Sequence, residues 1–152
     1  MRVRQATEDD MREILAGGEN FYHEARLWSF GFEWCPESFE KTVMYFMDSR
    51  DAAIFVATVA GKIVGSAAGI VSGWQFNHNQ KVMQEFWWFI EKEHRGGTAA
   101  MRLLKSLLEW GKQMGVVVNV LAHMEIDNSK RLDGLYKKMG FSVMESHYAR
   151  GS

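Results

Sequence analysis

The sequence has little cysteine, little proline and almost no net charge. Cys35 is the single cysteine, which excludes an intramolecular disulfide and makes a reducing compartment the simplest expectation. The formal net charge is -1, so no overall field recruits nucleic acid or an anionic membrane. No apolar run reaches membrane-spanning length, because charged or polar residues interrupt each one. We therefore expect no membrane partner, and the charge disfavours a nucleic-acid partner.

The start of the chain also lacks the apolar stretch of a signal peptide, and residues 2–6 instead predict a strand. The cytoplasm is therefore the expected location. Methionine and aromatic residues are abundant, with 10 Met, 6 Trp and 13% aromatic residues. This apolar surplus fits a ligand site, a second subunit in a homodimer, or an ordinary core. The length of 152 residues suits one domain, residues 1–152, around one core.

Hydrophobic periodicity and turn residues predict the order β-α-α-β-β-β-α-β-α-β, a mixed α/β sandwich. The first helix, from Thr7 to Ala25, is expected to break at Gly17-Gly18, since glycine weakens a helix interior. Residues 73–80 are expected to form a polar loop. The expected strands are residues 2–6, 52–59, 62–72, 81–90, 116–121 and 141–148. Among them, residues 116–121 form a continuous apolar run, which is typical of a strand buried on both faces, and residues 141–148 would close the sheet.

A glycine-containing turn joins the strand that ends at Ile90 to an amphipathic helix. Small residues at positions 96, 97, 99 and 100 let a ligand approach the backbone closely. The first N–H groups of such a helix point outward beside its positive dipole end, which suits a pyrophosphate, and Arg95 adds a charged donor. Alternatively, the small residues only permit tight packing of the helix on the sheet, and the turn alone does not decide.

Two motifs give this turn a context. Arg95, Thr98 and Ala100 stand where the GNAT superfamily of acetyltransferases carries Arg/Gln-x-x-Gly-x-Gly/Ala. The segment Leu135-Tyr-Lys-Lys-Met-Gly-Phe141 matches the family pattern Leu-Tyr-x-Lys-x-Gly-Phe without a change. Because both motifs have the family's separation and order of elements, the whole chain resembles this superfamily. Thr98 departs from the usual glycine, although Gly96 and Gly97 are adjacent.

The resemblance implies a mainly antiparallel central sheet flanked by helices, and acetyl-coenzyme A (acetyl-CoA) as cofactor. In the family, the fourth and fifth strands splay apart and pantetheine pairs with the backbone of the fourth strand. Backbone N–H groups of the following turn hold the pyrophosphate. The cofactor-binding residues implied in this way are Trp88, Phe89, Ile90, Arg95, Gly96, Gly97, Thr98, Ala99, Ala100, Met101 and Asn128. Asn128 equally suits an N-cap of the last helix.

The resemblance also implies direct attack of a primary amine on the thioester. Tyr136 takes the family's position for the hydroxyl that protonates the leaving thiolate; its alternative is simple packing of the last helix. A backbone N–H between Trp88 and Ile90 would polarise the thioester carbonyl. An alkyl amine has a pKa of about 10 and is mostly protonated at neutral pH, so a route for proton removal is needed.

Glu85 is the candidate base, because it is the only carboxylate inside the fourth strand. Strand alternation groups it with Met83, Trp87 and Phe89 and away from Trp88. The family's glutamate aligns with the neighbouring Gln84. A bulge could rotate Glu85 into the site, a water chain could connect it, or it is an ordinary solvated or ion-paired carboxylate.

The aromatic-rich segment 21–34 corresponds to the family's variable acceptor region. Its candidate acceptor residues are Tyr22, His23, Trp28 and Phe30, which equally suit core or dimer contacts. The acceptor itself stays open between a small-molecule amine and a protein lysine or N-terminus. The five histidines lack metal-ligand spacing, so no metal is expected. The rival functions are a regulatory or interaction module that binds acyl-CoA with little turnover, and a protein directed at nucleic acid.

Overall fold

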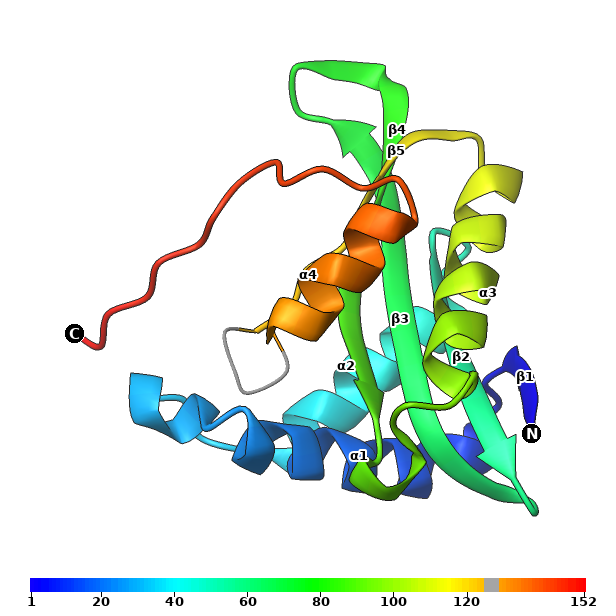
Figure 1. The fold of residues 1–152 in the computed structure, drawn as a ribbon, viewed down its shortest axis with the longest axis vertical. Coiled ribbons are helices and arrows are strands. Elements are labelled where there is room, and N and C mark those ends of the chain that lie inside the picture. Colours follow the sequence, from blue (N-terminus) through cyan, green and yellow to red (C-terminus); the bar gives the residue numbers. More distant parts are fainter. Residues whose placement is uncertain (125–128) are drawn as a thin grey trace.

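The computed structural model describes residues 1–124 and 129–152. At its centre is a five-stranded sheet in the order β1-β2-β3-β4-β5 (Figure 1). The strands are β1 (Arg2–Gln5), β2 (Ala52–Val59), β3 (Lys62–Trp74), β4 (Asn77–Ile90) and β5 (Val116–Val120). The first four pair antiparallel with their neighbours, and β5 runs parallel to β4. The predicted mixed α/β fold with a mainly antiparallel sheet is confirmed.

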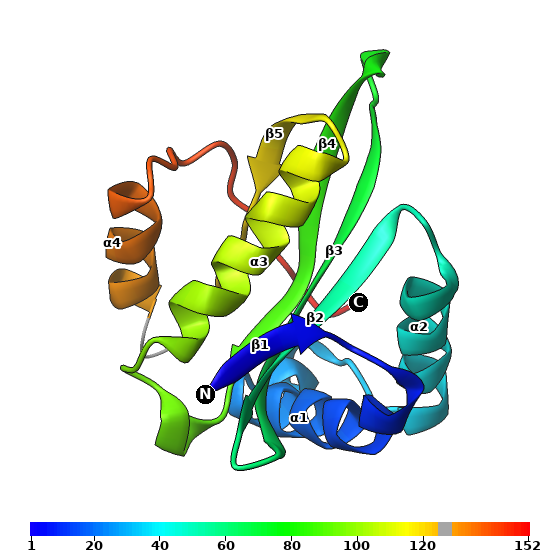
Figure 2. The same cartoon turned by 90° about the vertical axis from the view of Figure 1, so that its right-hand side faces the viewer.

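Helices cover both faces of the sheet. The helices α1 (Met11–Glu24) and α2 (Pro36–Asp48) lie on one side, α3 (Ala99–Gln113) lies on the other, and α4 (Ser129–Lys138) lies beside the β5 end of the sheet (Figure 2). Short 3-10 helices η1 (Glu8–Asp10), η2 (Leu27–Phe30) and η3 (Lys92–His94) join these elements. Over the described part of the chain, no helix combines the length and the apolar character that crossing a bilayer requires.

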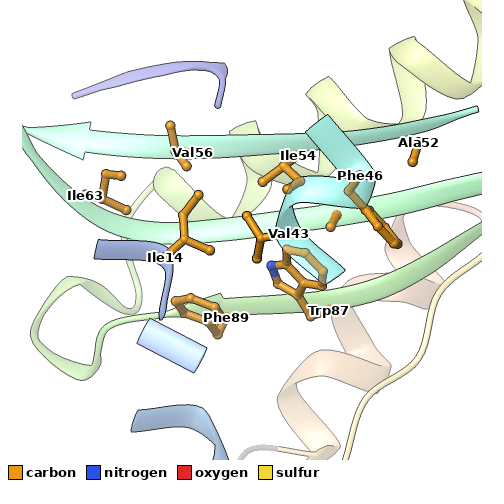
Figure 3. Close-up of a cluster of buried hydrophobic side chains, with 10 residues drawn as sticks. Ile14, Val43, Phe46, Ala52, Ile54, Val56, Ile63, Trp87 and Phe89 are labelled. Atoms are coloured by element: carbon orange, nitrogen blue, oxygen red, sulfur yellow. The ribbon is translucent and has the colours of Figure 1, made fainter. Parts of the chain in front are cut away.

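Each face of the sheet has its own apolar core. Under α1 and α2, Ile14 and Val43 pack against Trp87 and Phe89 of β4 (Figure 3). On the other face, α3 buries Leu103, Leu104 and Leu107 completely, as its helical spacing predicts. The middle strands are therefore covered on both sides, and β4 contributes side chains to both cores.

Helix α1 continues through Gly17-Gly18, so the predicted break is wrong. A Cβ atom on Gly17 would overlap the ring of Phe89, and one on Gly18 would lie 2.5 Å from Cε1 of Phe39. The two glycines therefore let the backbone of α1 approach β4 and α2 closely. Tertiary packing outweighs the weak helix propensity of glycine at these positions.

Three further sequence predictions are wrong at the edge of the sheet. Residues 73–80 are mostly strand, because β3 and β4 extend into a protruding hairpin (Figure 1). β5 is an edge strand rather than a buried one, and Val117 and Val118 are 59% and 44% exposed. Residues 141–148 form no strand, and among the described residues no strand pairs with the outer edge of β5. After α4 the chain runs out to the C-terminus as an irregular segment (Figure 1).

We predict that Gly17→Ala lowers the free energy of unfolding by about 1–3 kcal/mol, because the added methyl group overpacks the contact with Phe89. The matched control is Gly134→Ala in α4, where an added Cβ meets nothing within 4 Å. This control should stabilise the protein by about 0.4–1 kcal/mol through the unfolded state. Urea unfolding of both variants tests the prediction, and equal effects of the two substitutions would contradict it.

Candidate functional site

β4 and β5, the last two strands of the sheet, diverge partway along β4. Their pairing runs from Lys81 opposite Val116 to Gln84 opposite Val120, and within the described residues it goes no further. From Glu85 to Ile90, the only described strand that pairs with β4 is β3. The free edge of β4 therefore presents backbone N–H and C=O groups that could pair with an extended ligand. This divergence agrees with the splay that the family resemblance implies.

A β-bulge lies where the two strands begin to diverge. Ala68 of β3 is opposite Trp87, and Gly69 is opposite Glu85, so Phe86 is the extra residue on β4. A bulge of one residue reverses the alternation of side chains beyond it. A bulge is one of the alternatives that the sequence leaves open for Glu85, and the structure contains one at the next residue, Phe86.

The bulge changes which side chains share a face. Trp87 and Phe89 enter the core under α1 and α2, whereas Trp88 packs on the core under α3. Met83 also faces α3, and Glu85, two residues further along the strand, lies on the same face as Met83. The predicted grouping of Glu85 with Trp87 and Phe89 is therefore wrong, because it assumed unbroken alternation. Glu85 and Trp88 share one face.

Glu85 and Tyr136 are joined through the backbone of Ala122, in the segment that follows β5. The N–H of Ala122 donates to Oε2 of Glu85 at 3.0 Å. The hydroxyl of Tyr136, in α4, donates to the carbonyl oxygen of Ala122 at 2.8 Å. The structure thus brings the two predicted catalytic residues together on either side of one backbone position, next to the point where β4 and β5 diverge.

The surroundings of these two groups shift their pKa values upward. Burial raises the pKa of Glu85 to about 7, although the hydrogen bond from Ala122 opposes the shift. Burial, with the nearby charge of Glu85, also raises the pKa of Tyr136. At neutral pH, Glu85 is therefore close to half deprotonated, while Tyr136 keeps its proton. A base poised near neutrality beside a protonated hydroxyl suits proton transfer in both directions.

Trp88 contributes a polar atom with no hydrogen-bond partner among the described residues. Its indole Nε1 is buried, and its ring centroid lies 6.1 Å from that of Tyr136. Buried donors almost always have an acceptor, so an unmatched one at the free edge of β4 fits a site that takes a ligand with carbonyl groups. Acetyl-CoA has such groups in its thioester and in its pantetheine amides.

The turn after β4 has the backbone that close approach of an anion requires. Gly96 takes a left-handed conformation with φ 84°, which glycine adopts without strain. Thr98 is the N-cap of α3 with φ -84°, a conformation that suits any residue. Threonine is therefore accommodated where the family usually has glycine. Ala99, Ala100 and Met101 form the first turn of α3, as expected for N–H groups that face a pyrophosphate.

The side chain of Arg95, which the sequence predicts to contact pyrophosphate, is engaged by groups of the protein itself. Its guanidinium pairs with the carboxylate of Glu24 on α1, and its Nε donates to the carbonyl oxygen of Ile90 at 2.8 Å. The ion pair lowers the pKa of Glu24 and raises that of Arg95. Arg95 therefore fastens the turn to α1, and its predicted contact with pyrophosphate stays a prediction.

Arg131 is a residue that the sequence analysis missed. It lies in the first turns of α4, and a Cβ built on Gly96 would be 3.4 Å from its Nη2. This cation thus reaches the turn from a helix that begins about 30 residues later in the chain. Neither motif marks it, because the contact between α4 and the turn exists only in the folded chain.

The predicted acceptor residues are spread around the end of α1 and η2. The hydroxyl of Tyr22 donates to the carbonyl oxygen of Phe32 at 2.7 Å, and His23 packs edge-on against the Tyr22 ring. Trp28 is 50% exposed and Phe30 is 40% exposed. The guanidinium of Arg26 lies 5.4 Å from the centre of the Trp28 ring. Trp28 and Phe30 therefore lie at the surface rather than in a closed pocket.

Two hollows lie near these elements. One of about 220 Å³ lies between α1 and the end of β4, and its lining includes Phe21, Glu24, Phe89 and Arg95. A larger one, of about 570 Å³, lies outside α3 and β5 and does not include Glu85 or Tyr136. In the described residues no group of three or more His, Cys, Asp or Glu side chains could hold a metal ion. Asn128 lies outside the described residues.

Comparisons with known proteins agree with this geometry. A family model described as "Acetyltransferase (GNAT) family" matches residues 19–141. The ribosomal-protein-alanine N-acetyltransferase from Brucella melitensis biovar Abortus 2308 is 17% identical, with 98% of each chain covered and a TM-score of 0.71. AAC(6')-IG from Acinetobacter haemolyticus, an aminoglycoside antibiotic 6'-N-acetyltransferase, is 12% identical, with 100% and 98% coverage and a TM-score of 0.75.

A third similar structure is AAC(6')-Iy in complex with the bisubstrate analogue CoA-S-monomethyl-acetylneamine. It is 13% identical, with 99% of this chain and 97% of that chain covered and a TM-score of 0.75. At these identities, the three structures show a shared fold. Among curated proteins, none matches the sequence significantly.

Proposed function

The chain belongs to the acetyltransferase (GNAT) family, and on this premise we propose that it transfers an acetyl group from acetyl-CoA to a primary amine. The observation that carries the proposal is the pair of Glu85 and Tyr136, held on the backbone of Ala122 beside the free edge of β4. Acetyl-CoA supplies the acetyl group as an activated thioester. The residues of this chain then have to hold it, accept one proton and donate another.

Glu85 is proposed as the base. With a pKa of about 7, its carboxylate can accept a proton from the ammonium form of the acceptor, directly or through a water molecule. The amine nitrogen then forms a bond to the carbonyl carbon while the bond from that carbon to sulfur breaks. Backbone N–H groups between Trp88 and Ile90 are proposed to stabilise the negative charge that develops on the carbonyl oxygen.

Tyr136 is proposed as the acid. Its raised pKa keeps the hydroxyl protonated at neutral pH, so it can give a proton to the thiolate that leaves. The hydroxyl donates to the carbonyl oxygen of Ala122, which holds it beside Glu85. The nitrogen of an ammonium acceptor loses two protons as it becomes an amide: Glu85 takes one before the attack, and the second passes to solvent as the bond to sulfur breaks. Tyr136 gives one proton to the thiolate, solvent returns Glu85 and Tyr136 to their starting states, and the net change is the release of one proton to solvent.

The turn 95–98 and the start of α3 are proposed to bind the pyrophosphate. Support comes from the left-handed Gly96, the outward N–H groups of the first turn of α3 and the approach of Arg131. Since Arg95 is neutralised by Glu24, Arg131 is the cation better placed to face the phosphates. Arg95 instead is proposed to fix the position of the turn.

The proposed acceptor is a small-molecule amine or an amine of a protein. Several proteins of the same fold are aminoglycoside acetyltransferases, and another acts as a ribosomal-protein-alanine N-acetyltransferase. The exposed aromatic group of Trp28 and Phe30 favours an acceptor with a planar or apolar part, since such a part can stack on it. Release of free thiol from acetyl-CoA across a panel of amines tests the activity, and cofactor binding without thiol release would instead support a regulatory module.

We predict that Tyr136→Phe lowers kcat by about 100-fold or more, because the general acid is lost. The affinity for acetyl-CoA should stay within about twofold, since the ring and its packing remain. Steady-state rates and calorimetric binding separate the two quantities. Unchanged kcat would leave Tyr136 with a packing role only.

The rate of acetyl transfer should rise with pH through about 7 in the wild type, because Glu85 has to be deprotonated. In Glu85→Gln, this limb of the pH–rate profile should disappear, and kcat should fall by about 100-fold or more at its plateau. If the rise of the rate with pH persists in Glu85→Gln, a group other than Glu85 causes it.

The same variant has a stability readout that is independent of activity. The folded protein keeps the Glu85 proton up to about pH 7, whereas the ordinary value for the unfolded chain is 4.5. The unfolded state thus binds fewer protons in this window, and the wild type loses stability as pH rises through it. Glu85→Gln escapes this loss, so its free energy of unfolding relative to wild type should increase between pH 5 and pH 8.

We predict that Arg131→Ala weakens the binding of coenzyme A by about tenfold, because a charge-assisted hydrogen bond to phosphate is lost. Binding of pantetheine, which lacks the phosphates, should not change. Arg95→Ala serves as the comparison, and it should lower thermal stability more than Arg131→Ala does. Equal losses of coenzyme A and pantetheine affinity in Arg131→Ala would contradict a phosphate contact.

A further inference from the structure

Two neighbouring tryptophans on β4 differ in the hydrogen bonding of their indole N–H groups. The indole N–H of Trp87 donates to Oγ of Ser66 at 3.0 Å, and Ser66 is fully buried at 0% exposure. The indole N–H of Trp88 is buried as well, but no described residue accepts its hydrogen bond. Ordinary strand alternation places the two rings on opposite faces of the sheet, and the bulge at Phe86 decides which face each ring takes (Figure 3 shows Trp87 inside its core).

A buried donor without an acceptor destabilises the folded protein. Such a donor is therefore expected where a ligand supplies the missing acceptor. Trp88 lies on the part of β4 that β5 has left. Its ring is beside Tyr136, and it shares a face with Glu85, beyond the bulge. The missing acceptor therefore coincides with the place where the proposed reaction occurs.

We propose that the indole N–H of Trp88 donates a hydrogen bond to a carbonyl oxygen of the acyl-pantetheine arm of acetyl-CoA. The inference rests on the proposed function and adds a side-chain donor to the backbone N–H groups of β4. An indole N–H is a donor only, so its partner has to be an acceptor such as a carbonyl oxygen. Trp88 is in this view a positioning residue that orients the arm beside Glu85 and Tyr136.

Phenylalanine substitutions at positions 87 and 88 test the proposal as a matched pair. Trp88→Phe removes no hydrogen bond within the described protein, and it should weaken acetyl-CoA binding by about fivefold to thirtyfold. Trp87→Phe leaves the buried hydroxyl of Ser66 without its partner, and it should lower the melting temperature while acetyl-CoA affinity stays unchanged. Calorimetric binding and thermal unfolding give the two readouts. Equal acetyl-CoA affinity in the wild type and in Trp88→Phe would overturn the proposal.

Nuclear magnetic resonance of the wild-type protein tests the same hydrogen bond directly. The six tryptophans give indole N–H signals, and loss of a signal in each variant assigns Trp87 and Trp88. Addition of acetyl-CoA should move the proton of Trp88 to lower field and leave that of Trp87 in place. A Trp88 signal that does not move in a protein saturated with acetyl-CoA would overturn the proposal.

Coenzyme A without the acetyl group distinguishes the two possible acceptors. A shift with acetyl-CoA alone assigns the thioester carbonyl, and a shift with both compounds assigns a pantetheine amide; either result supports the hydrogen bond. Failure of this inference is distinct from failure of the proposed function. A wild-type protein that releases thiol while Trp88→Phe binds and reacts equally well refutes only the role of Trp88. A wild-type protein that binds no acetyl-CoA refutes both.

Discussion

Side chains on a regular strand alternate between its two faces, so Glu85 and Trp88 of β4 would point in opposite directions. One extra residue at Phe86 removes this conflict. Before the bulge, Met83 and Glu85 face α3; after it, Trp88 takes over that face while Trp87 and Phe89 fill the core under α1 and α2. The same strand thereby anchors one core and supplies the carboxylate, the indole and the free backbone edge of the candidate site.

The face of β4 that carries Glu85 and Trp88 lies next to the point where β4 and β5 diverge. β5 leaves β4 after Gln84, and the chain beyond it passes close enough for Ala122 to bond Glu85 on one side and Tyr136 on the other. A carboxylate that is desolvated but still hydrogen-bonded has a pKa near neutrality, as a general base requires. The site therefore combines an open strand edge with an acid and a base whose pKa values are both raised by burial.

Near the turn at 95–98, two arginines have different surroundings. Arg95 is close in sequence to the helix N-terminus, yet Glu24 and the carbonyl oxygen of Ile90 engage it. Arg131 is remote in sequence but approaches Gly96 in space. The left-handed backbone falls on Gly96, and Thr98 keeps a negative φ. For this reason, the departure of Thr98 from the family's usual glycine places no strain on the turn.

The sequence by itself determined the mixed α/β fold, most element boundaries, and the family, because periodicity, turn residues and the motif from Leu135 to Phe141 are local signals. It also named Glu85 and Tyr136 as candidates. Only the tertiary structure decided that Glu85 shares a face with Trp88, that α1 continues through Gly17-Gly18, that β5 is an edge strand, and that Arg131 approaches Gly96 while Arg95 pairs with Glu24. Each of these depends on contacts between segments that are distant in the chain, such as Phe89 against Gly17 and β3 opposite the bulge. Local propensity does not contain such contacts, so packing and strand register decided them.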